Sequence, residues 1–201
     1  MAILDIRVLG DPILREQTAL VPEITDVLQT LIDDMFATMH AAEGIGLAAP
    51  QVGRSERLAV IQVDDAPLVI INPEIVSTAG RAKAEEGCLS IPEIYGNVER
   101  PERIVVRALD RNGTPFELEA SGLLARCIQH EVDHLNGKLF IDYFSLLKRR
   151  SAAKDWEKEV GKYPNFIRTL EPGAPRPRKS RVRGEGSSEG AGESVDDGAE
   201  R

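Results

Sequence analysis

The segment Glu23–Glu43 carries apolar residues at the spacing of one buried helix face. These residues recur every three or four positions, which places their side chains on a single stripe of an α-helix. They are Ile24, Val27, Leu28, Leu31, Ile32, Met35, Phe36 and Met39. Thr25 can cap the first turn because its hydroxyl accepts a hydrogen bond from an otherwise unpaired backbone N–H. The pattern therefore predicts an N-terminal helix that begins near Thr25.

The middle of the chain changes to short runs rich in β-branched residues, which are typical of strands. The runs cover residues 57–63, 67–76, 103–110 and 114–120. Asn112 and Gly113 lie between the last two runs and predict a hairpin turn. From Ser121 the helical period returns, and a further helix is predicted over residues 144–160. The predicted fold class is α+β, with mixed or antiparallel sheets packed around a central helix and with an N-terminal and a C-terminal helix.

The composition indicates one domain followed by a tail. A chain of 201 residues with 42% hydrophobic content can bury one good core. We expect this single domain to cover residues 1–171. Residues 172–201 are poor in aliphatic residues and rich in Pro, Gly, Ser and charged residues, so they cannot bury enough surface to order themselves. They are predicted to form a disordered tail on a protein that we expect to be a monomer.

The charge and the apolar runs exclude several classes of partner. The formal net charge is -8, whereas a DNA-binding protein needs clustered Lys and Arg to displace phosphate counterions. No apolar run approaches the length of about 18 residues that spans a bilayer, and the N-terminus lacks the pattern of a signal peptide. We therefore expect a cytoplasmic protein without DNA or membrane partners.

The tail contains a basic block followed by acidic residues. Five positive charges lie in the eight residues Arg176–Arg183, which is compatible with contact to the ribosome near the peptide exit. Six carboxylates between Glu185 and Glu200 cancel this charge. The expected state of the tail is a solvated extension.

The loop "GIGLAAPQVG", Gly44–Gly53, imitates the G-x-G-x-x-A turn that binds dinucleotide phosphates. Such a turn follows a strand and opens a helix, whereas this one follows a predicted helix and Pro50 interrupts any helix that starts in it. Asp64 lies at about the right distance downstream, ~20 residues, for a ribose contact. A nucleotide-binding module is therefore the weakest of three functional hypotheses.

The segment "QHEVDHLNG" indicates a metal site. His130 and His134 are four residues apart on a predicted helix, so their imidazoles project to the same side, one turn apart. Glu131 lies between them in angle and can reach a water on a metal ion without binding the ion. This helix is also predicted to face the core, because its apolar residues share one face. A catalytic metal site at this position is the favoured interpretation.

The third metal ligand has more than one candidate. Thermolysin-like proteases take a glutamate from a downstream helix, for which Glu157 and Glu159 are available, whereas the metzincin position for a third histidine is occupied by Phe140. Cys88 in "EEGCLSIP" supplies a thiolate, and one thiolate with two imidazoles suits a divalent metal. Cys127 precedes His130 by one turn and is predicted to line the pocket beside the metal.

Three motifs in order carry a family resemblance. "GIGLAAPQVG", "EGCLS" and "QHEVDHLNG" resemble the signature motifs of the peptide deformylases, and "RVLGDPILR", "INPEIV", "LDRNGTPFELEA" and "GKLFIDY" are similar to the same family. The resemblance extends from about Leu4 to Leu147. It implies a hydrolase that removes the formyl group from N-formylmethionyl peptides and releases formate. The alternative is an HExxH zinc endopeptidase with a downstream glutamate ligand.

The resemblance also implies roles for individual residues. The metal ligands are Cys88, His130 and His134, and the general acid and base is Glu131. Ferrous iron is the expected ion, with Zn²⁺, Ni²⁺ and Co²⁺ as alternatives. The other implied catalytic positions are the Gln51 amide and the Leu89 backbone N–H, which bind the oxyanion, and Gly46, whose backbone approaches the substrate. The implied methionine pocket is lined by Ile45, Glu86, Leu123 and Cys127, with Arg126 at its mouth and its guanidinium expected to reach solvent.

Overall fold

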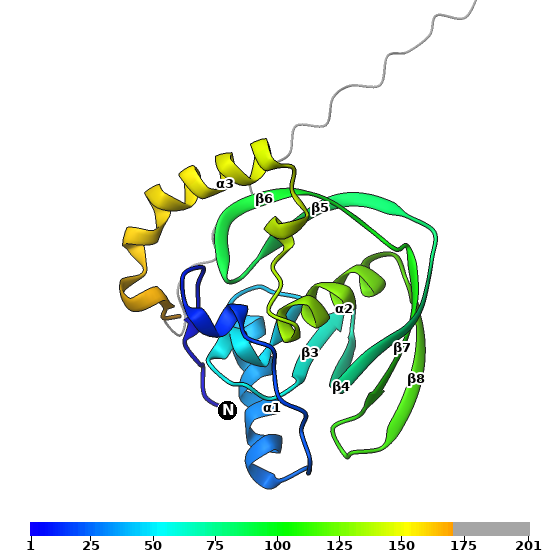
Figure 1. Cartoon of the computed structure of the whole chain (residues 1–201). Coiled ribbons are helices and arrows are strands. Elements are labelled where there is room, and N and C mark those ends of the chain that lie inside the picture. Colours follow the sequence, from blue (N-terminus) through cyan, green and yellow to red (C-terminus); the bar gives the residue numbers. More distant parts are fainter. Residues whose placement is uncertain (171–201) are drawn as a thin grey trace, which may run out of the picture.

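A five-stranded antiparallel sheet is the largest layer of the structure, a computed structural model that describes residues 1–170 (Figure 1). Its strand order is β2-β3-β4-β7-β8, and every neighbouring pair is antiparallel. The strands are β2 (Gly46–Ala48), β3 (Leu58–Val63), β4 (Ala66–Ala79), β7 (Arg103–Leu109) and β8 (Pro115–Ser121). The predicted hairpin at Asn112 and Gly113 joins β7 to β8, with Gly113 at a φ of 81°.

Two further sheets have two strands each. β5 (Ala82–Cys88) pairs with β6 (Ile91–Arg100), and β1 (Ile6–Arg7) pairs with β9 (Ile167–Arg168). The β5–β6 hairpin was missed by the sequence patterns. From Ile94 onward β6 buries every second residue, but two of these inward positions hold Gly96 and Arg100. Because neither residue is apolar and β-branched, the period of two is hidden in the sequence.

Within the described residues, three α-helices pack around these sheets: α1 (Asp26–Ala41), α2 (Gly122–Leu135) and α3 (Leu146–Glu159). Short 3-10 segments are η1 (Pro12–Arg15), η2 (Ala49–Val52), η3 (Phe140–Tyr143), η4 (Val160–Lys162) and η5 (Pro164–Phe166). Thr25 caps α1 as predicted, because its hydroxyl accepts a hydrogen bond from the Leu28 N–H at 3.2 Å. Ser121 occupies the cap position of α2, but its side chain makes no capping hydrogen bond. The α+β prediction with a central helix is confirmed.

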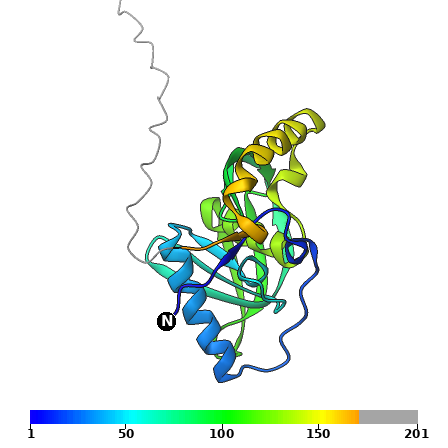
Figure 2. The same ribbon diagram turned by 90° about the vertical axis from the view of Figure 1, so that its left-hand side faces the viewer.

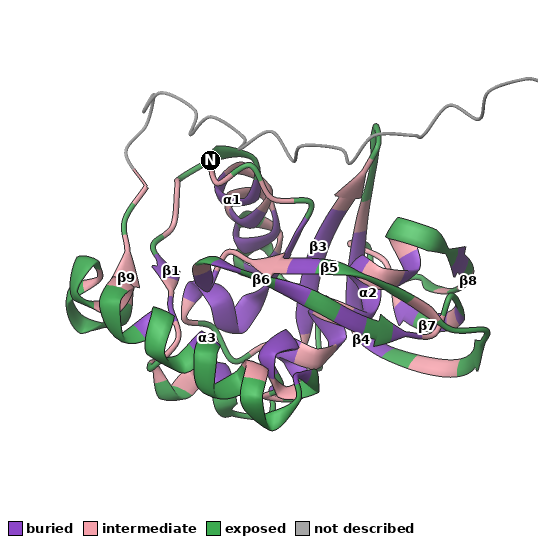
Figure 3. Cartoon of the chain, turned by 90° about the horizontal axis from the view of Figure 1, so that it is seen from above, coloured by how far each residue is buried: buried purple, intermediate pink, exposed green. Residues whose placement is uncertain are grey.

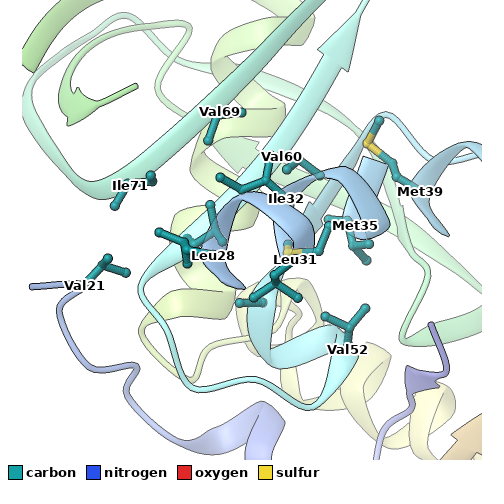
Figure 4. Close-up of a cluster of buried hydrophobic side chains, with 13 residues drawn as sticks. Val21, Leu28, Leu31, Ile32, Met35, Met39, Val52, Val60, Val69 and Ile71 are labelled. Atoms are coloured by element: carbon teal, nitrogen blue, oxygen red, sulfur yellow. The ribbon is translucent and has the colours of Figure 1, made fainter. Parts of the chain in front are cut away.

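The five-stranded sheet is covered on both faces. Along β3, Leu58 and Val60 belong to the cluster that contains α1, whereas Ala59 and Ile61 belong to the cluster that contains α2. Alternate strand residues point to opposite faces, so the two helices lie on opposite sides of the sheet. Figure 4 shows the α1 side, where Leu28, Leu31, Ile32, Met35 and Met39 pack against Val60, Val69 and Ile71. Because β3 is buried on both faces, its residues 58–61, "LAVI", form a continuous apolar run.

The C-terminal part of the described chain returns to the N-terminal segment (Figure 2). Trp156 of α3 donates its Nε1–H to the Leu9 carbonyl at 3.0 Å and stacks on the ring of Tyr163 at 5.8 Å. The outer surface of α3 is exposed, whereas α2 is largely buried between the layers (Figure 3). The predicted tail, residues 172–201, lies outside the described residues. None of the helices in residues 1–170 is both long and apolar enough to cross a membrane.

Candidate active site

Cys88, His130 and His134 converge at one point between the β5–β6 hairpin and α2. One ligand atom from each lies within 4.8 Å of the others. Sγ of Cys88 is 3.2 Å from Nε2 of His134. The ring centroids of His130 and His134 are 5.0 Å apart. The two histidines stand one turn apart on α2, and Cys88 ends β5. The fold therefore brings the thiol to the histidine pair, which the sequence patterns left open.

The other candidates for a third ligand lie elsewhere. Glu157 is exposed on α3, and Glu159 pairs with Lys162 at 2.6 Å. Phe140 is buried, with its ring 6.1 Å from that of His130. The glutamate-ligand arrangement of thermolysin-like proteases is therefore wrong for this chain.

The nucleotide-binding interpretation of the Gly44–Gly53 loop is also wrong. The segment follows α1 and forms β2 and then a single 3-10 turn, η2, rather than opening a helix. Asp64 sits exposed in the tight turn between β3 and β4, with a φ of 58°. The loop instead lies directly against α2, because Gly46 approaches Cys127 and Glu131.

Glu131 is a buried carboxylate beside the three converging side chains. It is 3% exposed, and its Oε2 has no hydrogen-bond partner within residues 1–170. Burial raises the pKa of Glu131 to about 7, although the positive charges of His130 and Arg100 oppose that rise. A carboxyl group that titrates near neutral pH is suited to both accept and donate a proton.

Gly46 permits the close approach of the β2 backbone to this carboxylate. A Cβ at Gly46 would overlap the carboxylate of Glu131 and would lie 2.7 Å from Sγ of Cys127. Cys127 is itself buried, and its Sγ contacts the Ile45 carbonyl at 3.5 Å. Burial raises the pKa of the Cys127 thiol well above its ordinary value, so this thiol stays protonated. Only glycine fits between α2 and β2 at this position.

Gln51 has a fixed orientation. Its Oε1 accepts a hydrogen bond from the Ala48 N–H at 2.8 Å, so the amide Nε2 faces the other way. Nε2 donates to Oγ of Ser90 at 3.2 Å and to Sγ of Cys88 at 3.6 Å. Leu89 lies between Cys88 and Ser90, in the turn that joins β5 to β6. The Gln51 amide and the Leu89 backbone therefore border the same space beside the thiol.

Glu86 lies at the centre of a buried ionic network. Its carboxylate accepts hydrogen bonds from Arg100 at 2.6 and 3.0 Å, from Arg126 at 2.5 Å and from Nδ1 of His130 at 3.1 Å. Arg100 also donates to Asp133 at 2.7 Å. Burial disfavours the charged form of Glu86, but the bonds from His130 and Arg100 outweigh burial and lower its pKa to about 2. Glu86 is therefore ionised at neutral pH.

The sequence patterns missed this network. Arg100 and Asp133 were not singled out, because charged residues are usually found on the surface. Arg126 was expected to reach solvent, and this is wrong, because its side chain is only 11% exposed. Glu86, Arg100 and Arg126 lie far apart in the sequence, so no local spacing marks them as partners.

Two predicted pocket residues stay accessible at the edge of the site. Ile45 is 42% exposed before β2, and Leu123 is 56% exposed in the first turn of α2. Both side chains are apolar, so they offer a surface for an uncharged side chain.

The donor atoms at the convergence point fit a divalent transition metal. A thiolate with two imidazoles suits iron, cobalt, nickel or zinc better than magnesium or calcium. His130 directs its Nδ1 to Glu86, which leaves Nε2 available for a metal ion. Among the described residues, Oε2 of Glu131 is a buried acceptor without a partner, so it could accept a hydrogen bond from a water molecule.

Comparison with known proteins agrees with this site. The sequence profile of the family described as polypeptide deformylase matches residues 3–150. The chain belongs to the peptide deformylase family.

Individual relatives match over most of their length. The peptide deformylase of Hydrogenovibrio crunogenus is 54% identical over 165 residues, which cover 81% of this chain and 98% of the relative. A crystal structure of a peptide deformylase from Legionella pneumophila matches with a TM-score of 0.77 and 51% identity, covering 80% of this chain and 97% of that one. The Ehrlichia chaffeensis deformylase in complex with actinonin matches with a TM-score of 0.77 and 41% identity, covering 79% and 98%.

Family membership establishes the activity. The protein is a metal-dependent hydrolase that removes the formyl group from the N-terminal methionine of newly made polypeptides. The zinc endopeptidase alternative is therefore rejected. The peptide deformylase family uses a bound metal, and the Cys88, His130 and His134 group is the candidate site for it among the described residues.

Proposed function

We propose that Cys88, His130 and His134 hold the metal ion and that Glu131 is the general acid and base of formyl hydrolysis. The observation that carries this proposal is the convergence of three donor atoms within 4.8 Å beside a buried, unpartnered carboxylate oxygen. A divalent ion held there supplies a Lewis acid and lowers the pKa of a bound water toward neutrality. We propose ferrous iron as the ion in the cell, on the resemblance to other deformylases, with zinc, nickel and cobalt as substitutes.

Glu131 moves the proton in this scheme. Its pKa of about 7 allows the carboxylate to take a proton from the attacking water. Water adds to the formyl carbon, the bond from that carbon to the methionine nitrogen breaks, and formate leaves. The proton held by Glu131 passes to the departing nitrogen, which becomes the free amine of the peptide.

Gln51 and Leu89 bind the oxygen of the formyl group as negative charge develops on it. Oε1 of Gln51 is occupied by the Ala48 N–H, so the donor end of the amide is turned toward Cys88. The Leu89 N–H follows Cys88 directly in the chain. Such preorganised donors stabilise an oxyanion more than the neutral carbonyl, which lowers the barrier to attack.

The peptide substrate lies along the outer edge of β2. This strand is at one end of the five-stranded sheet, so an extended peptide can pair with it as a further strand. Gly46 keeps that edge close to Glu131. Ile45, Leu123 and Cys127, with Glu86 behind them, then border the slot for the methionine side chain.

Peptide hydrolysis tests this assignment directly. The full chain loaded with Fe²⁺ under exclusion of oxygen is incubated with formyl-Met-Ala-Ser, and formate is measured. We expect formate release from the formylated peptide and no cleavage of longer unformylated peptides. Internal cleavage products in the mass spectrum would reject the proposed substrate geometry.

We also propose that residues 1–171 form the complete catalytic domain of a cytoplasmic monomer. A chain that ends at residue 171 is then expected to keep the turnover and melting temperature of the full chain. Contact of residues 176–183 with the ribosome is a separate proposal, supported only by their charge. Sedimentation of the full and shortened chains with ribosomes at two salt concentrations tests this contact. Salt-sensitive co-sedimentation of the full chain alone would support it.

A further inference from the structure

The metal donors come from two elements that share no backbone ladder. Cys88 belongs to the β5–β6 hairpin, which forms its own two-stranded sheet, whereas His130 and His134 belong to α2. Backbone hydrogen bonds of the five-stranded sheet therefore cannot hold the hairpin in place. The position of Cys88 relative to the two imidazoles depends on contacts outside that sheet, among them the hydrogen bond from the Leu9 N–H to the Ser90 carbonyl at 2.8 Å and side-chain contacts between the hairpin and α2.

Arg126 makes such contacts with both strands of the hairpin. Its Nη2 donates to the Ala82 carbonyl of β5 at 2.7 Å. Its Nη1 donates to the Val98 carbonyl of β6 at 3.0 Å and to Oε1 of Glu86 at 2.5 Å. One planar guanidinium thus joins α2 to three acceptors, a geometry that its fixed fork of donors allows. At 11% exposure, the side chain makes these bonds largely away from water.

The contacts form a series along the two elements. Arg126, His130 and His134 are each one helical turn apart on α2, and they contact Ala82, Glu86 and Cys88 of β5 in that order. Arg126 is the end of this series that carries a permanent charge.

We propose that Arg126 is a positioning residue that fixes the β5–β6 hairpin on α2 and so presets Cys88 against His130 and His134 for a divalent transition metal. This inference rests on the proposed ligand roles of those three residues. Removal of the guanidinium leaves two carbonyls without this donor and Glu86 without one of its two cations. The carboxylate that orients His130 and the strand that carries Cys88 then both lose a restraint.

Cobalt binding tests the proposal independently of turnover. The full-length metal-free protein is titrated with Co²⁺ against a competing chelator, and the thiolate-to-cobalt absorption band is recorded. Arg126→Met is expected to weaken Co²⁺ binding about 10- to 100-fold, the usual effect of losing a group that orients metal ligands. It is also expected to shift the absorption band and to speed amide hydrogen exchange in residues 82–100. Parental affinity, absorption and exchange in Arg126→Met would overturn the positioning role.

Controls separate this result from other failures. Arg107→Met removes an arginine whose side chain is 64% exposed and paired with Glu117, and it is expected to bind Co²⁺ as the parent does. Cys88→Ala tests the ligand set itself: Co²⁺ binding that survives it would reject the proposed function rather than the role of Arg126. If Arg126→Met does not fold, Arg126→Lys decides, because one ammonium cannot reach all three acceptors. Severalfold weaker binding supports the proposal, and parental binding refutes it.

Discussion

Nδ1 of His130 lies 3.1 Å from Oε2 of Glu86, a residue that is 44 positions away in the sequence. This bond fixes the ring, because Nδ1–H points to the carboxylate and Nε2 is left to face Cys88 and His134. His134 lacks an equivalent bond, since its buried Nδ1 has no hydrogen-bond partner in the part of the chain that the structure describes. The two imidazoles of the motif are therefore held in different ways, one by an anion and one by packing.

The two cysteines are expected to respond differently to substitution. Cys88→Ala should abolish stoichiometric metal binding, because two imidazoles alone hold a divalent ion poorly. Cys127→Ala should keep the metal, since Sγ of Cys127 contacts the Ile45 carbonyl rather than the donor group. Metal content after dialysis measures both variants. Loss of metal from the Cys127 variant alone would refute the ligand assignment.

Glu131→Gln separates the base from the ligands. The variant keeps the size of the side chain but cannot take a proton from water, so turnover should fall about 10²- to 10⁴-fold. Metal content should stay at the parental level, because Glu131 is not among the converging donors. Formate release and elemental analysis on the same preparation provide both values. A metal-free Glu131→Gln protein would show instead that this carboxylate is a ligand.

Gln51→Leu removes the proposed oxyanion donor while keeping a similar volume. Because Gln51 is 1% exposed, an apolar replacement fits the burial but leaves the Ala48 N–H without its acceptor. Turnover should fall about 10²- to 10³-fold, the usual effect of losing one such donor. Single-turnover formate release measures the chemical step. A matched control is Gln62→Leu, at a partly buried amide that pairs with His40, for which parental turnover is expected. Full activity of Gln51→Leu would remove Gln51 from the mechanism.

The ionised side chain of Asp142 is expected to make a pH-dependent contribution to the free energy of unfolding. Burial disfavours its ionisation, but hydrogen bonds from Arg15 at 2.6 and 3.2 Å outweigh burial and lower its pKa. A carboxylate with a lowered folded pKa stabilises the fold above its unfolded pKa, and this contribution is lost as the pH falls through the folded value. Asp142→Asn should therefore lower the free energy of unfolding by up to about 1 kcal/mol at pH 7, since the pair is partly exposed.

The difference between Asp142→Asn and the parent should shrink as the pH falls below about 4, near the unfolded pKa of aspartate. Urea unfolding of the metal-free proteins at pH 7 and pH 3 measures it. Asp155→Asn serves as the control, because its pair with Lys158 is exposed on α3 and should contribute little at either pH. An equal loss of stability at both pH values for Asp142→Asn would contradict the ionic origin.

Local patterns in the sequence were sufficient to predict several elements and part of the site of this protein. The apolar period of α1, its Thr25 cap and the spacing of His130, Glu131 and His134 on one helix all follow from interactions within a few residues. Three ordered motifs then pointed to the family that the comparisons show. These features need no knowledge of distant contacts, because helix geometry alone places residues four apart on one face.

Only the tertiary structure decided which distant side chain joined the histidines and what oriented them. Cys88 and Glu157 were both compatible with a third ligand, and the choice depended on how a hairpin outside the main sheet lies on α2. That hairpin was hidden because Arg100 takes an inward position in β6, where a period of two predicts an apolar residue. Arg100 is buried and Arg126 is largely buried because both bind Glu86. A charged side chain is stable inside a protein only with such a partner, and a partner 14 or 40 residues away is set by the fold.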